Sequence, residues 1–435
     1  MNLWRNVLRA GVISGLLVCG TGLDAQDTAY ARRIVESLSS QEFHGRGYVD
    51  DGDWKAAQFV AAEMRKQGVR EFSRTAFQDF HINVNTFPGH QRVRVNGRAL
   101  EPGRDFIVRP CSHKGGGIYK ASYYDVNGFD DPGYIRKIRS ERFEFSVPVL
   151  DRSKLDSTRP EFVRHYQTFF DAMHLDSKPS MPALIEVGLP RLIWGTGSEV
   201  CAIPIVQIRD SALLNEEINQ IRVDILPEYK EKYLTQNVLG YIEGSLQPGS
   251  FILITSHYDH LGRLGPDLHF PGAGDACGVA MMLDLARHFA ESGVEPKHSL
   301  AFIAFGGTEV DLAGSEFFVH HPWVKPEEIA FQINLEGIGF GDQGIWAVNG
   351  KEVPEEFNRL MSLNGRGRFL KEIRATGADR SGDHFHFAGK GVRAITIRGI
   401  DAEQRNNSID DRPERLTFAD YEGLFRLLAE FIQTF

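Results

Sequence analysis

The sequence predicts an α/β fold: a mainly parallel mixed sheet flanked by helices, with an inserted smaller domain of mixed strands. From Asn237 onward, short apolar runs alternate with segments that carry apolar residues at helical spacing, a pattern typical of a mainly parallel sheet. Between residues 118 and 233 this alternation is replaced by short strand-like runs separated by polar turns. A chain of 435 residues is also long enough for two or three domains.

The periodicity of apolar residues predicts the individual elements in order. Before the insert we expect helices at 30–38 and 54–68, strands at 80–84 and 92–96, and a glycine-rich loop at 110–117. Within the insert we expect strands at 146–150, 183–187 and 202–208. After the insert we expect strands at 238–242, 251–255, 300–305, 329–335 and 392–397, with helices at 278–292 and 421–431. The predicted organisation is therefore an α/β domain of residues 26–117 and 234–435, interrupted by an inserted domain of residues 118–233.

Residues 1–25 have the pattern of a secretory signal peptide. Two arginines precede a short apolar run, and small or neutral residues then lead to a plausible cleavage site after Ala25. The run is too short to cross a hydrocarbon core of about 30 Å, and no later segment is long enough. Cys19 follows Val18 rather than a small residue, which disfavours a lipid anchor. We therefore expect an exported protein, periplasmic or extracellular, with no transmembrane segment.

Composition excludes some classes of partner. The net charge is −9, and charged residues make up 25% of the chain with no block of one sign. Such an acidic and evenly mixed surface argues against nucleic acids and anionic membranes as main partners.

Three cysteines remain after the predicted cleavage: Cys111, Cys201 and Cys277. Export permits a disulfide, and Cys111 with Cys201 is the pair to test. Three buried free thiols explain the sequence equally well. The sequence leaves both readings open.

Five side chains of the type that binds metals lie at the ends or starts of the predicted elements. Two imidazoles and three carboxylates suit a pair of zinc ions that share one carboxylate, although manganese or cobalt would also fit these ligand types. Helix capping would explain the aspartate and one histidine, but it does not explain glutamates that follow long apolar strands. The five residues are His257, Asp275, Glu309, Glu336 and His384.

The segments around these residues resemble the co-catalytic zinc aminopeptidase family, which also includes glutaminyl cyclases and the transferrin-receptor ectodomain. The similarity covers about residues 29–108 and 237–435, and the insert is placed like the protease-associated domain of some members. The matching segments are ITSHYDHLG, FPGAGDACGVA, FIAFGGTEVDLAGS, INLEGIG, GDHFHFAGKGV and NSIDDRPERL. The resemblance implies a zinc aminopeptidase-like fold, one or two zinc ions and a peptide substrate.

The resemblance also implies a role for each metal-type residue. His257 and Glu336 would bind one zinc ion, and Glu309 and His384 the other. Asp275 would bridge the two ions. Asp259 would hold the ring of His257 through a carboxylate–imidazole hydrogen bond.

The family pattern breaks at Thr308. The family segment reads Gly-Glu-Glu, in which the first glutamate is the general base, whereas this chain reads Gly307-Thr308-Glu309. A threonine hydroxyl is not basic enough to accept a proton from the attacking water near neutral pH, and the loss of a general base costs about 10²–10⁴ in rate. Either Glu309 or Asp311 could take over this role, and the sequence favours neither.

Further departures surround this position. The segment that contains Asp275 is one residue shorter than in the family, and Glu336 stands where the family usually has aspartate. Asn407 occupies the position of a histidine near the substrate carbonyl; it can donate a hydrogen bond, but not as a charged group. Asp311 replaces a glycine beside the site.

Two functions follow from these observations. The first is an exported metal-dependent aminopeptidase, with activity that is weakened or lost because Thr308 stands in the position of the base. The alternative is a non-catalytic protein that binds peptides or a partner on the peptidase scaffold. Glutaminyl cyclisation ranks below both, because it too needs a carboxylate at the position of Thr308.

Overall fold

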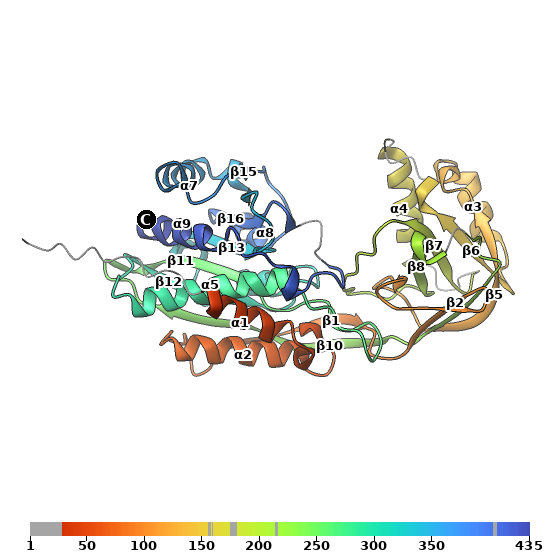
Figure 1. Ribbon diagram of the computed structural model, residues 1–435, viewed down its shortest axis with the longest axis horizontal. Helices are drawn as coiled ribbons and strands as arrows, with labels where there is room; N and C mark the ends of the chain where they lie inside the picture. The colour runs from red at the N-terminus through yellow and green to blue at the C-terminus, as the bar shows by residue number, and fades with distance from the viewer. Residues whose placement is uncertain (1–27, 155–157, 159, 175–180, 214–215, 403–406) are drawn as a thin grey trace, which may run out of the picture.

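The computed structural model describes residues 28–435 apart from 155–157, 159, 175–180, 214–215 and 403–406. The predicted signal peptide, with Cys19, lies outside the described residues. Figure 1 shows two lobes, each built around its own sheet, joined by long strands and loops. None of the helices in the described part of the chain combines the length and apolar character that crossing a bilayer requires.

The first lobe has the predicted α/β architecture. Its eight-stranded mixed sheet has the order β1-β10-β12-β11-β13-β16-β14-β15, and the central strands β12, β11, β13 and β16 are parallel. The strands are β1 Phe77–Thr86, β10 Glu228–Ile242, β12 His298–Phe305, β11 Gln247–His257, β13 Ile329–Glu336, β16 Ala394–Gly399, β14 Ile345–Val348 and β15 Ile373–Ala375. The helices of this lobe are α1 Thr28–Leu38, α2 Gly52–Lys66, α5 Ala273–Glu291, α6 Ala313–His320, α7 Pro354–Gly367, α8 His384–Gly389 and α9 Tyr421–Gln433.

Helices cover both faces of this sheet, which explains why its central strands read as continuous apolar runs. In β11, Ile252 and Ile254 belong to the core that contains α1, α2, α5 and α9. Leu253 points to the opposite face and joins a second core with Phe318 of α6 and Phe387 of α8. This two-sided burial leaves the strand ends as the place where polar side chains gather.

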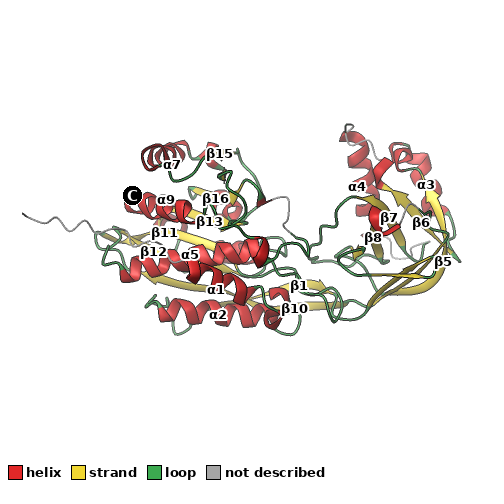
Figure 2. Cartoon of the chain, viewed as in Figure 1, coloured by secondary structure: helices red, strands yellow, loops and turns green. Residues whose placement is uncertain are grey.

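The second lobe contains another eight-stranded mixed sheet, with the order β3-β2-β9-β5-β6-β7-β8-β4. Its strands are β2 Gln91–Val95, β3 Arg98–Leu100, β4 Phe106–Val108, β5 Gly115–Tyr124, β6 Ser146–Asp151, β7 Leu184–Leu189, β8 Ile205–Arg209 and β9 Gln220–Ile225. Two helices, α3 Pro132–Ser140 and α4 Pro160–His174, lie on this sheet (Figure 2). Phe129, which lies just before α3, packs on Phe169 of α4 within their shared core.

The second sheet begins earlier in the sequence than the predicted domain boundary at residue 118. Strands β2 to β4 precede that residue, yet they belong to the second sheet, and β2 is hydrogen-bonded antiparallel to β9. The segment at 110–117, predicted to be a loop, contributes its last three residues to β5. Pairing with a strand more than a hundred residues later decides where β2 belongs, and local periodicity carries no information about that partner.

The two lobes meet through an aromatic contact. Trp194, in the loop after β7, lies with its ring 4.7 Å from that of Phe270 and 5.8 Å from that of Phe87. Its backbone nitrogen donates a hydrogen bond to the carbonyl of Asn407 at 2.9 Å. The loop after β7 is thereby packed against the first lobe near the carboxyl ends of its strands.

The sequence allowed either a disulfide or three free thiols, and the structure contains the disulfide. Cys111 and Cys201 are bonded to each other, and Cys277 is a free thiol buried in α5. The bond joins positions 90 residues apart within the second lobe. It therefore closes a long loop and limits the conformations of the unfolded chain.

We expect the double substitution Cys111→Ser and Cys201→Ser to lower the free energy of unfolding by about 2–4 kcal/mol, because the long loop becomes unconstrained. Denaturant unfolding monitored by fluorescence measures the change. A reductant should bring the wild type to the stability of the double variant and leave the variant itself unaffected. Equal stability of the oxidised wild type and the variant would contradict this account.

Candidate metal centre

The centre lies at the carboxyl edge of the parallel strands. His257 is the last residue of β11 and Glu336 the last of β13, and Glu309 follows β12 after a short turn. These strands are parallel neighbours, so their carboxyl ends meet at one edge of the sheet. This is the edge at which open α/β sheets bind ligands.

A buried arginine and a glycine bring Asp275 to the same edge. The guanidinium of Arg46 donates to the carbonyls of Tyr258, Pro271 and Gly272 at 2.7–2.8 Å and so fixes the approach to α5. Gly272 has φ +58°, and a Cβ there would lie 2.4 Å from the ring of His260. Asp275 then sits in the first turn of α5, where the helix dipole favours a carboxylate.

Three of the five predicted metal ligands come together. His257, Asp275 and Glu309 each offer a ligand atom, and these atoms lie within 4.8 Å of one another. The Nε2 of His257 is 3.5 Å from an oxygen of Asp275. Burial opposes the charged imidazole, but the carboxylates of Asp275 and Asp259 raise the pKa of His257 well above its usual value. The group therefore attracts positive charge.

Asp259 is held in place from several directions. Its Oδ2 accepts hydrogen bonds from the hydroxyl of Tyr48 at 2.6 Å and from the backbone nitrogen of Glu309 at 3.1 Å. The Nδ1 of His257 is 3.1 Å from the backbone carbonyl of Asp259 and 3.4 Å from its Oδ1. Asp259 thus links the turn after β11 to the turn after β12, and its backbone carbonyl is the nearer partner of the imidazole.

Sequence reasoning missed two residues of the centre. The Nδ1 of His260 is 2.8 Å from Glu309 and 3.2 Å from Asp275. Ligand atoms of His260, Asp275 and Asp411 form a second group within 4.8 Å. Burial opposes the charged form of His260, yet hydrogen bonds to Asp275 and Glu309 raise the pKa of this imidazole to about 9. Both residues occur in the family-like segments SHYDHLG and NSIDDRPERL, and this was the available signal.

The other two predicted ligands, Glu336 and His384, do not belong to these two groups. Glu336 accepts a hydrogen bond from Asn334 at 2.6 Å and pairs with Arg398 at 2.7 Å. His384 begins α8, and its Nδ1 is 2.8 Å from the hydroxyl of Thr396.

Thr308 faces a carboxyl group. Its hydroxyl donates to Asp383 at 2.8 Å, and burial together with the nearby Glu336 raises the pKa of Asp383 to about 7. Asp311 is exposed and accepts a hydrogen bond from Ser198 in the second lobe. Asn407 adopts a left-handed conformation, and its carbonyl accepts the bond from Trp194 described above.

The buried polar atoms indicate that the centre fits a cation. The Nε2 atoms of His260 and His384 are buried and have no hydrogen-bond partner within the part of the chain that the structure describes. The same holds for one oxygen each of Asp259, Asp383 and Asp411. Buried polar groups without partners are costly, and a bound ion would satisfy those that face it. Imidazole and carboxylate donors suit zinc.

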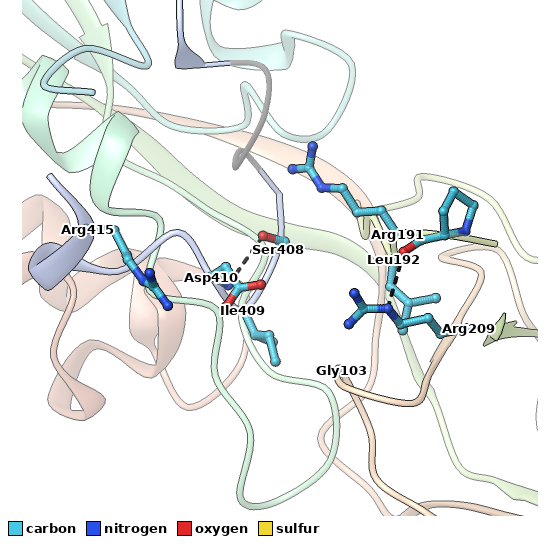
Figure 3. A pocket seen from close by; sticks show the side chains of 9 residues that line it. Gly103, Arg191, Leu192, Arg209, Ser408, Ile409, Asp410 and Arg415 are labelled. Atoms are coloured by element: carbon cyan, nitrogen blue, oxygen red, sulfur yellow. Dashed lines mark hydrogen bonds between the residues drawn. The ribbon is translucent and has the colours of Figure 1, made fainter. Parts of the chain in front are cut away.

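A cavity of about 420 Å³ lies between the two lobes (Figure 3). Three of its side chains are arginines and one is an aspartate, so its field favours an acidic group. In Figure 3 the dashed lines join Arg209 to the carbonyl of Pro190 and Asp410 to Ser408. The lining residues are Gly103, Pro190, Arg191, Leu192, Arg209, Ser408, Ile409, Asp410 and Arg415.

Comparisons with known proteins agree with this fold. The model of peptidase family M28 matches residues 237–432. A vacuolar membrane protease of Candida glabrata is 33% identical over 113 residues, which covers 26% of this chain and 11% of that protein. The matched part thus spans about a tenth of that curated relative's length.

Solved structures match nearly the whole chain. A zinc aminopeptidase from Bacillus subtilis superimposes with a TM-score of 0.67 at 16% identity, covering 94% of each chain. A peptidase M28 precursor from Shewanella amazonensis gives a TM-score of 0.71 at 15% identity and covers 94% of this chain and 93% of that one. At such identities the likeness concerns the fold, which these proteins share in both lobes.

Proposed function

The chain belongs to peptidase family M28 through residues 237–432, and from this premise we propose that it is a metal-dependent aminopeptidase that removes residues from peptide N-termini. The observation that carries the proposal is the group formed by His257, Asp275 and Glu309 at the carboxyl edge of the sheet. Zinc held there would supply a Lewis acid that polarises the scissile carbonyl.

The protein's own residues prepare the centre for this chemistry. Asp259 is held by the hydroxyl of Tyr48 and contacts both the ring of His257 and the backbone nitrogen of Glu309, and so fixes their relative positions. Thr308 occupies the position of the general base. Its hydroxyl can donate and accept hydrogen bonds but is not basic enough to accept the proton of the attacking water. We therefore propose turnover that is slow, by about 10²–10⁴, relative to a centre with a carboxylate there.

We also propose that the protein works outside the cytoplasm. The signal-like sequence of residues 1–25 supports export, and the bond between Cys111 and Cys201 suits an oxidising compartment.

The preference for N-termini can be tested with one peptide in two forms. We expect the zinc-loaded protein to shorten the peptide with a free amino terminus and to leave its N-acetylated form intact, as followed by mass spectrometry. Cleavage of both forms at internal bonds would contradict the aminopeptidase assignment. Saturable binding of both forms without any cleavage would favour the alternative, a binding protein on this scaffold, which Thr308 suggests.

A further inference from the structure

Glu336 and Arg398 are set side by side by the sheet itself. Strands β13 and β16 are parallel neighbours, and their register pairs Glu336 with Arg398. The guanidinium of Arg398 donates to an oxygen of Glu336 at 2.7 Å and to the carbonyl of Ser381 at 2.7 Å. The side chain of Arg398 is 18% exposed, so this pair is largely withdrawn from water.

Both oxygens of Glu336 accept hydrogen bonds. Arg398 donates to Oε2, and the buried amide of Asn334 donates to Oε1 at 2.6 Å. Gly382 closes the remaining side, because a Cβ there would lie 2.8 Å from Oε1. The carboxylate is therefore neutralised and enclosed by the chain itself.

The carboxylates of Asp275 and Glu309 have different neighbours. Within the described residues, the basic side chains that form ion pairs with them are the imidazoles of His257 and His260. A ring nitrogen of imidazole can itself bind a metal ion, so these neighbours are compatible with an ion. A guanidinium does not lose its proton in proteins and stays a fixed positive charge. An ion at Glu336 would thus meet a cation that cannot be neutralised.

We propose that the centre holds a single ion, bound by His257, Asp275 and Glu309, and that the guanidinium of Arg398 takes the place of a second ion at Glu336. This inference rests on the proposed metal-dependent function, since both require a metal in the centre. It assigns Arg398 as a positioning residue that fixes the number of ions.

The test is the zinc content of the purified full chain, loaded with excess zinc, freed of unbound metal by gel filtration and measured by plasma mass spectrometry. We expect one ion per chain in the wild type and two in Arg398→Met, which frees Glu336. Arg393→Met is the matched control, because Arg393 lies just before β16 and pairs with Glu356; it should keep one ion. Glu336→Gln should also keep one ion, and circular dichroism verifies that each variant is folded.

Each other outcome overturns the inference. Two ions or none in the wild type, one ion in folded Arg398→Met, or loss of an ion in Glu336→Gln would each contradict it. The proposed function is tested separately. A one-ion protein without peptide turnover would contradict the proposed function alone. A two-ion protein that hydrolyses peptides would contradict this inference alone.

Discussion

Replacing Thr308 by glutamate is expected to raise the rate of zinc-dependent peptide hydrolysis about 10²- to 10⁴-fold, the usual contribution of a general base. The hydroxyl of Thr308 is 2.8 Å from a carboxyl oxygen of Asp383, so the position faces this carboxyl group. A second carboxylate close to Asp383 would be disfavoured in its charged form, which moves its pKa toward neutrality and suits a proton acceptor. Steady-state kinetics with a free-amine peptide measures the change, and the gain should appear in kcat.

The matched control for this substitution is Thr308→Gln, which has nearly the same shape and no basic oxygen. It should gain nothing over the wild type. An equal gain in both variants would mean that side-chain length matters rather than basicity. A wild type as fast as Thr308→Glu would mean that another group, such as Glu309 or Asp311, accepts the proton, and would contradict the role assigned to position 308.

The second large effect is expected from His257→Ala, which should abolish both tight zinc binding and hydrolysis. His257 is the one imidazole among the three side chains of this group, and its loss leaves the group with two carboxylates, which hold zinc less well. Zinc content after gel filtration and the rate of peptide cleavage should fall together to background.

The control for this variant is His81→Ala, which removes an exposed histidine from β1. It should keep the zinc content and the activity of the wild type. Hydrolysis that survives in His257→Ala would refute the proposed centre, because no metal-dependent route through this group would then remain.

The fold could be predicted from the sequence where burial on both faces leaves a strong signal. Strands β11, β12 and β13 read as apolar runs, and His257 and Glu336 end two of them. Short elements such as β15, with three residues, have no periodicity to detect. The partner of β2 could not be inferred either, because pairing with β9 depends on the tertiary fold.

The candidate site could be predicted in part. Motif spacing brought His257, Asp275 and Glu309 to attention, and the structure places them together. Motif spacing did not indicate Arg398. The contact of Arg398 with Glu336, 62 residues earlier, depends on the register between β13 and β16. The buried arginine Arg46 was missed for the same reason: its partners are backbone carbonyls that only the folded chain assembles.

The most direct test of metal-dependent aminopeptidase activity uses a mixed peptide pool. The full chain is stripped with a chelator, divided, and incubated with the pool with and without added zinc, beside Thr308→Glu treated alike. Our account predicts N-terminally shortened peptides only in the samples with zinc, slowly in the wild type and faster in the variant. Shortening that does not depend on zinc, or intact peptides in all samples, would contradict it.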